Sequence, residues 1–191
     1  SYNVQNYGVA KKAQNWFINS KRTNANINKY LARKEKNTYN DFMDEKITFK
    51  QAKKRIEAVA KFHNTKKTLK KLENLHSSRI AFTKAQEYKK IGKLYNELSE
   101  YCKVIKSDKK HYAIAQEQIK QKKGALKKTV LSKLKEYADS GNADDGLTYF
   151  EKIIHIFRDD PDIEAYKGSL LDIKMKNEKL KAEKEQSIEI L

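Results

Sequence analysis

Apolar residues recur along most of this chain at spacings of three and four, the pattern that places them on one face of an α-helix. No stretch alternates apolar and polar residues over the length of a strand, so we expect no β-sheet. The pattern predicts an all-α fold of about seven helices joined as antiparallel hairpins. Short polar or glycine-containing segments mark the expected breaks: Asn19–Asn28, Asp44–Lys46, His63–Thr65, Gly92, Ser107–Lys109, Ser140–Asn142 and Asp159–Pro161.

Two of the predicted segments are less regular than the rest. The Asn- and Thr-rich stretch 19–28 separates two amphipathic patterns, and Thr23 or the asparagine after it is expected to cap the second helix. The segment Tyr112–Ala138 predicts one long helix whose middle, 116–128, carries few bulky apolar side chains. We expect this helix either to project past its neighbours or to bend at Gly124.

A segment of the chain is repeated. Residues Glu87–Ile105 return 49 positions later as Glu136–Ile154, with six identical residues. In each copy a glycine, Gly92 or Gly141, is expected to take the left-handed conformation that ends a helix. A stripe of leucine, aromatic and isoleucine side chains then predicts the buried face of the next helix. Such repetition is typical of stacked helical arrays, which usually present a surface to a partner.

The second helix of each copy resembles the second helix of a tetratricopeptide repeat. The resemblance covers Gly92–Asp108 and Gly141–Ile154, with Asp160-Pro161 where that family places its closing Asp-Pro, and a weaker copy runs over Phe49–Val59. It implies tetratricopeptide-like hairpins stacked as an α–α superhelix. The family's Trp and Leu-Gly signatures are missing from the preceding helices.

That family places a small residue near the start of its second helix, which allows a close approach to the first helix. Ala52 and Gly146 suit this position, whereas Glu97 does not, and Leu98 is expected to take over the contact. The 49-residue period also exceeds the family's usual period of about 34 residues. The chain therefore resembles a divergent member of the repeat class.

We expect three parts along the chain. Residues 1–43 form N-terminal helices that pack on or cap the array, residues 44–171 form the divergent repeats, and residues 172–191 form a polar helical extension. In style and composition the chain also resembles helical-repeat regions of secreted lipoproteins and membrane-anchored proteins of low-GC Gram-positive bacteria. This implies an extracytoplasmic location, anchored at the membrane or wall, with the cytoplasm as the alternative. No apolar run reaches 18 residues, so any anchor is expected before Ser1.

Positive charge is concentrated in the first part of the chain. Residues 1–135 hold 34 Lys and Arg against 11 Asp and Glu, whereas residues 136–191 hold 8 against 14. This polarity favours contact with an anionic surface through the basic part, or head-to-tail self-association. The alternative interpretation is that lysine, which outnumbers arginine 37 to 5, is only the solvating residue of an AT-rich genome.

Residues that carry chemistry are few and scattered. The histidines have no His or Cys partner at helical metal-ligand spacing, and Cys102 has no histidine nearby in sequence. Acidic clusters such as Asp144-Asp145 fall at predicted helix starts, where capping explains them without a metal. No glycine-rich phosphate-binding loop occurs. We therefore expect a non-enzymatic protein without a cofactor, metal site or catalytic residue.

The expected function is binding or scaffolding of a protein or peptide partner. Outward positions of the repeats supply the candidate partner-binding residues: Tyr95, Asn96, Glu100, Tyr149 and Lys152. Lysines at spacings of one, three and four supply a candidate surface for anionic lipids or wall polymers: Lys53, Lys54, Lys66, Lys67, Lys70, Lys71, Lys122 and Lys123.

Two alternatives remain open. Lysine-rich faces also suit the phosphate backbone of nucleic acid, although five arginines give little capacity for reading bases. The other alternative is a membrane-binding coiled-coil dimer built from long basic helices. Its weakness is that the regular breaks cut the chain into hairpin-sized helices.

Overall fold

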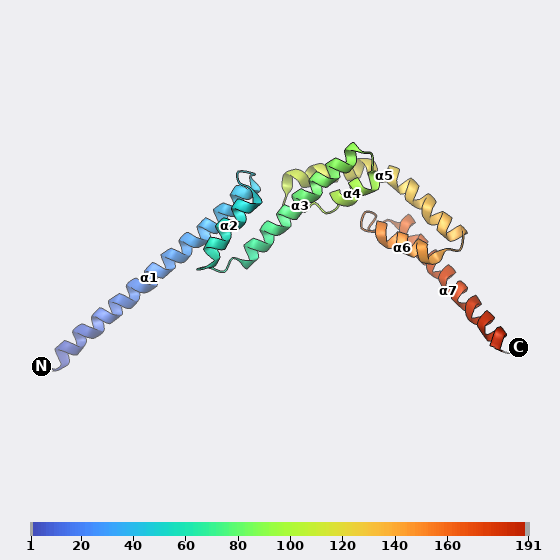
Figure 1. The fold of residues 1–191 in the computed structure, drawn as a ribbon. Helices are drawn as coiled ribbons and strands as arrows, with labels where there is room; N and C mark the ends of the chain where they lie inside the picture. Colours follow the sequence, from blue (N-terminus) through green and yellow to red (C-terminus); the bar gives the residue numbers. More distant parts are fainter. Residues whose placement is uncertain (1, 190–191) are drawn as a thin grey trace. The chain divides into compact units, whose positions relative to one another are not determined.

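A computed structural model describes residues 2–189, with side chains described from Asn15 to Glu185. Within this range the chain forms seven helices and no strand, which confirms the predicted all-α class (Figure 1). The helices are α1 (Tyr2–Met43), α2 (Phe49–Ala60), α3 (Lys66–Lys90), α4 (Leu94–Tyr101), α5 (Lys109–Asp139), α6 (Ala143–Ile153) and α7 (Pro161–Glu189).

Long and short helices alternate along the chain. The long helices have 42, 25, 31 and 29 residues, and the short ones between them, α2, α4 and α6, have 12, 8 and 11. The short helices bury the same three positions, four and three residues apart: Ala52, Ile56 and Val59 in α2; Glu97, Tyr101 and Val104 in or just after α4; Gly146, Phe150 and Ile153 in α6. The weaker copy predicted at Phe49–Val59 thus shares the burial pattern of the two stronger ones.

The chain divides into two compact units, Ser1–Ser77 and Ser78–Leu191, here called unit 1 and unit 2. The division falls inside α3. It does not coincide with the expected boundaries after residues 43 and 171.

Unit 1 is built on α1, which runs without a break through the Asn- and Thr-rich stretch. The predicted interruption at 19–28 is therefore wrong. Thr23 does not cap a new helix; its hydroxyl donates to the carbonyl of Asn19, one turn back, at 2.9 Å. The stretch contains neither glycine nor proline, so its weak helix formers do not stop the helix.

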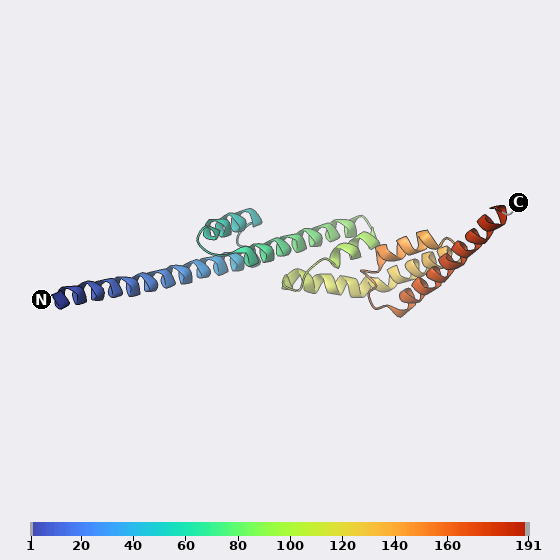
Figure 2. The ribbon, with the colours of Figure 1, turned by 90° about the horizontal axis from the view of Figure 1, so that it is seen from below.

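The start of α2 is fixed by a capping box. The backbone N–H of Gln51 donates to the hydroxyl of Thr48 at 3.2 Å, and the backbone N–H of Thr48 donates to the Gln51 side chain at 2.9 Å. α2 then packs against α1 and α3 through a small core: Phe42, Ala52, Ile56, Leu72 and Leu75. Figure 2 shows α2 beside the C-terminal part of α1.

In unit 2 the two predicted glycine stops are confirmed. Gly92 and Gly141 have φ angles of 69° and 71°. The backbone N–H of Lys93 donates to the carbonyl of Tyr88 at 3.0 Å, and that of Asn142 donates to the carbonyl of Tyr137 in the same way. These bonds satisfy carbonyls at the ends of α3 and α5.

A buried polar cluster joins α3 to the start of α5. The Ser78 hydroxyl accepts from the backbone N–H of Ile105 at 3.1 Å and donates to the carboxylate of Asp108 at 3.3 Å. That carboxylate also lies 2.9 Å from Nδ1 of His111 and 3.9 Å from Nε of Arg79. The cluster fixes the loop between α4 and α5, which positions α5 along α4.

The polar middle of α5 packs against its neighbours instead of projecting past them. Lys122 pairs with Glu97 of α4 at 2.6 Å, and Lys127 pairs with Asp160 at 2.8 Å, just before α7. α5 continues as a helix through Gly124. In this segment, ion pairs made by lysines thus supply contacts between helices that bulky apolar side chains supply elsewhere.

Several apolar side chains are exposed, although the periodic apolar pattern predicts that such residues face other helices. They are Phe62, Ile80, Ile114, Leu171 and Met175, each of which is 42–75% exposed. Ile80, Ile114, Leu171 and Met175 lie on long helices, so the periodic apolar pattern of these helices is broader than the face that neighbouring helices cover.

Candidate functional site

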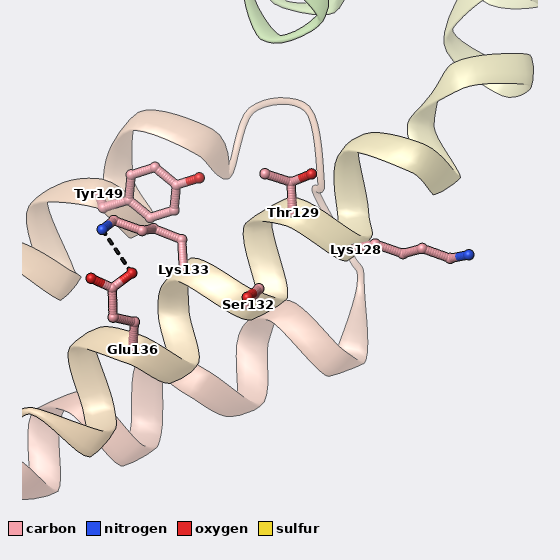
Figure 3. A pocket seen from close by; sticks show the side chains of 6 residues that line it. All are labelled: Lys128, Thr129, Ser132, Lys133, Glu136 and Tyr149. Carbon is pink, nitrogen blue, oxygen red and sulfur yellow. Dashed lines mark hydrogen bonds and ion pairs between the residues drawn. The ribbon is translucent and has the colours of Figure 1, made fainter.

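A hollow of about 660 Å³ lies along α5 beside α6 in unit 2 (Figure 3). Its lining comes from successive turns of α5 and from one residue of α6: Lys128, Thr129, Ser132, Lys133, Glu136 and Tyr149. Lys133 donates to Glu136 at 2.8 Å, and its ammonium also lies 5.0 Å from the centre of the Tyr137 ring. Figure 3 shows Tyr149 above this ion pair, while the amine of Lys128 points away from it.

Of the described residues that line this hollow, Tyr149 is the one aromatic residue, and Tyr137 packs beside it. The rings of Tyr149 and Tyr137 are 5.8 Å apart and inclined at 46°. Burial raises the pKa of Tyr149, and the nearby Tyr137 and Tyr95 hydroxyls raise it further. The phenol of Tyr149 therefore stays protonated at neutral pH and is available as a hydrogen-bond donor.

Beside the tyrosines, α4 and α6 are held together by polar contacts. The Tyr95 hydroxyl donates to the backbone carbonyl of Lys152 at 3.0 Å, and the Lys152 ammonium lies 5.4 Å from the centre of the Tyr95 ring. Ser99 Oγ and His155 Nε2 are 2.9 Å apart. Partial burial lowers the pKa of His155, which favours its neutral form.

The structure brings together three of the five predicted partner-binding residues. Tyr95, Tyr149 and Lys152 lie on one surface, which we call the Tyr149 surface and which includes the hollow. The expectation that all five are left out of packing is wrong for Tyr95 and Tyr149, which pack against the core of unit 2, while the exposed Lys152 contacts Tyr95 across α4 and α6. Asn96 is half-buried in α4, and Glu100 pairs with Lys103 at 2.6 Å.

Sequence reasoning missed part of this surface. Ser99, His155 and the α5 side chains from Lys128 to Glu136 were not among the predicted residues. Ser99 lies one turn after Tyr95, and His155 lies three residues after Lys152, so helical spacing was a usable signal for both. No sequence pattern could predict the hollow itself, because the hollow depends on how far α6 extends along α5.

The predicted anionic-surface lysines fall into two groups. Five are exposed on α2 and the first turns of α3: Lys54, Lys66, Lys67, Lys70 and Lys71. Lys53 is partly buried, 3.7 Å from Glu73. Lys122 and Lys123 do not suit the prediction, since the Lys122 ammonium pairs with Glu97 and that of Lys123 lies 5.4 Å from the Phe157 ring centre.

Cys102 is half-buried against the core of unit 2. Burial raises the pKa of its thiol, and the positive charge of Lys123 only partly opposes this shift. The side chain is thus shifted away from the thiolate form that acts as a nucleophile.

Across the described residues, no group of three His, Cys, Asp or Glu side chains is arranged to hold a metal ion. Within the same range, no helix combines the length and apolar character needed to cross a membrane. Comparison of the chain with protein-family models, with curated proteins and with solved structures gives no match.

Proposed function

We propose that this protein is a non-enzymatic binding module and that unit 2 holds a segment of a partner protein on the Tyr149 surface. The observation that carries the proposal is the hollow beside Tyr149, where the ring of this tyrosine meets two lysines and two hydroxyl groups. Tyrosines contribute large contact areas with a polar tip, a combination enriched at protein interfaces.

The polar groups of the surface favour a partner segment that carries a carboxylate. Lys128 is exposed at the edge of the hollow, and the protonated phenol of Tyr149 adds a hydrogen-bond donor. The internal pairing of Lys133 with Glu136 leaves the charge of Lys128 as the excess charge of the lining. An extended peptide with an aromatic and an acidic residue would match both features.

A selection experiment tests this proposal. Combinatorial peptides are selected on the immobilised full chain, and the affinity of the enriched peptides is measured by calorimetry. Lys128→Glu and Tyr149→Ala should each weaken binding at least about tenfold, in the range of interface hot spots. Lys120→Glu is the matched control, because Lys120 is exposed on the same helix but does not line the hollow. Peptides that bind equally to all variants would place the binding site elsewhere.

We further propose that the protein works outside the cytoplasm, close to an anionic envelope surface. The exposed lysines of α2 and early α3 support this, because delocalised positive charge suffices for lipid headgroups or wall polymers. The same lysines favour nucleic acid as the alternative ligand. A titration with duplex DNA across salt concentrations separates the two: the nucleic-acid alternative requires a steep fall of affinity with salt, and the absence of binding removes it.

A further inference from the structure

Residues 16–30 of α1 carry apolar side chains that the described part of unit 1 leaves in solvent. Trp16, Phe17, Ile27 and Tyr30 are 73, 54, 49 and 61% exposed. α2 covers α1 only further along, where Phe42 is buried in the small core. Figure 1 shows α1 continuing well beyond α2 toward its N-terminus.

These side chains fall on one side of the helix. At about 100° per residue, the arc from Tyr30 through Trp16 and Ile27 to Phe17 spans about 140°. Arg22, Lys29 and Arg33 lie on the opposite side, which also holds Ile18, and Lys34 lies within the arc. An apolar arc with aromatic side chains opposite a basic face is typical of helices that lie in the interface of a membrane.

Lysines near the arc lie over its rings. The Lys21 ammonium is 4.3 Å from the centre of the Phe17 ring, and that of Lys34 is 5.7 Å from the centre of the Tyr30 ring. Each pair therefore places a cation beside an aromatic ring. At a bilayer interface the ring would meet the acyl chains and the cation would meet the charged headgroups.

The net positive charge of this segment favours an anionic partner. Residues 1–34 contain seven Lys and Arg and no Asp or Glu. Two copies of such a helix, paired in either direction, would bring like charges together without any carboxylate for an interhelical ion pair. Anionic headgroups supply the opposite charge that a second copy lacks.

We propose that residues 16–30 of α1 bind the surface of an anionic lipid bilayer, with Trp16, Phe17, Ile27 and Tyr30 entering the boundary between headgroups and acyl chains. This deepens the envelope part of the proposed function by naming the lipid and the helix that meets it. It is separate from the Tyr149 surface, so peptide binding by unit 2 survives its failure.

The only tryptophan of the chain reports directly on this contact. The full chain is mixed with vesicles of equal parts phosphatidylglycerol and phosphatidylcholine, and with vesicles of phosphatidylcholine alone. Insertion should shift the Trp16 emission to shorter wavelength, protect it from acrylamide quenching and carry the protein upward in a flotation gradient. These effects are expected only with the anionic vesicles and should weaken as salt is raised.

The double variant Phe17→Ser, Tyr30→Ser keeps the fluorescent probe and should lower vesicle affinity about tenfold or more, because two aromatic side chains no longer leave water. Both residues are exposed, so circular dichroism should stay unchanged. Phe62→Ser is the matched control, since Phe62 is 75% exposed in unit 1 but lies outside α1; it should bind as the unaltered chain does.

Three results would overturn the proposal. The first is no emission shift and no flotation with the anionic vesicles. The second is equal loss of binding in the double variant and in Phe62→Ser. The third is a dimer in sedimentation equilibrium that the double variant dissociates, which would assign the apolar arc to a second copy of the chain.

Discussion

Glu97 is 2% exposed, and its carboxylate accepts a hydrogen bond of 2.6 Å from the ammonium of Lys122, joining α4 to α5. In α6 the corresponding position is Gly146, and in α2 it is Ala52. A buried ion pair therefore occupies a place where the other short helices use a small residue. Lys122, which lies in the polar middle of α5, supplies the positive charge that compensates the buried carboxylate of Glu97.

Removing the lysine from this pair should destabilise unit 2. Lys122→Met keeps the aliphatic length of the side chain but leaves the Glu97 carboxylate buried without its partner. We expect a loss of about 1–3 kcal/mol in the free energy of unfolding, below the range for fully buried pairs because Lys122 is partly exposed. Urea unfolding followed by circular dichroism measures this change.

Lys120→Met is the matched control for this variant, because Lys120 is exposed on the same helix, and its effect should stay within about 0.5 kcal/mol. The double variant Glu97→Leu, Lys122→Met should recover most of the lost stability, since no buried charge remains. A Lys122→Met protein as stable as the control would show that the pair contributes nothing.

Replacing two different glycines by alanine should change the stability of the protein in opposite directions. A Cβ atom at Gly146 would lie 2.7 Å from Cδ2 of Leu170 and 3.0 Å from Cβ of Tyr137, and Leu170 is fully buried. Gly146→Ala should therefore cost about 1–3 kcal/mol through overpacking. A Cβ atom at Gly124 would meet no neighbour within 4 Å, so Gly124→Ala should stabilise α5 by about 0.5–1 kcal/mol. Thermal unfolding of the two variants gives both signs; equal shifts would contradict the close approach at Gly146.

Turns of this fold could be predicted from sequence because local chemistry fixes them. Gly92 and Gly141 end helices at positive φ, and Pro161 begins one, each for reasons contained in the residue itself. The burial of Gly146 also followed from its small size. These features need no knowledge of the partner helix.

Features that depend on a distant partner could not be predicted. The pairing of Lys122 with Glu97 spans 25 residues, and the contact of Tyr95 with Lys152 spans 57. No local pattern specifies which lysine meets which carboxylate or ring. For that reason the lysines used inside unit 2 could not be told apart from those left on its surface.

The Cys102 thiol should react slowly. Burial raises its pKa, so less thiolate is present at a given pH than in the unfolded chain. Reaction with 5,5′-dithiobis(2-nitrobenzoate) near neutral pH should be slower in the folded protein than in urea and should accelerate as pH rises. Lys123→Gln should slow it further, because the ammonium favours the thiolate, whereas Lys120→Gln should leave it unchanged. A folded-state rate equal to that in urea would contradict the effect of burial.

Asp160 should make part of the stability of unit 2 depend on pH. Partial burial would raise the pKa of Asp160, but hydrogen bonds from Lys127 and from the backbone N–H of Ile163 outweigh it and hold the pKa below its usual value. A carboxyl group with a depressed pKa contributes stability that is present above its unfolded value near 3.8 and lost as pH falls through the folded value. Asp160→Asn keeps an oxygen that can cap α7 but removes the charge. We expect it to cost about 0.5–1 kcal/mol at pH 7 and to flatten the fall in stability between about pH 4 and pH 2.

Asp159→Asn provides the control for this pH profile. Asp159 is exposed and has a φ angle of 63°, a conformation that asparagine also tolerates, so the variant tests loss of a neighbouring charge without new backbone strain. Its stability should follow that of the unaltered chain from neutral to acidic pH. Urea unfolding midpoints are measured across this pH range. If Asp160→Asn kept the full pH dependence of stability, the hydrogen bond from Lys127 to Asp160 would not be what holds the start of α7 against α5.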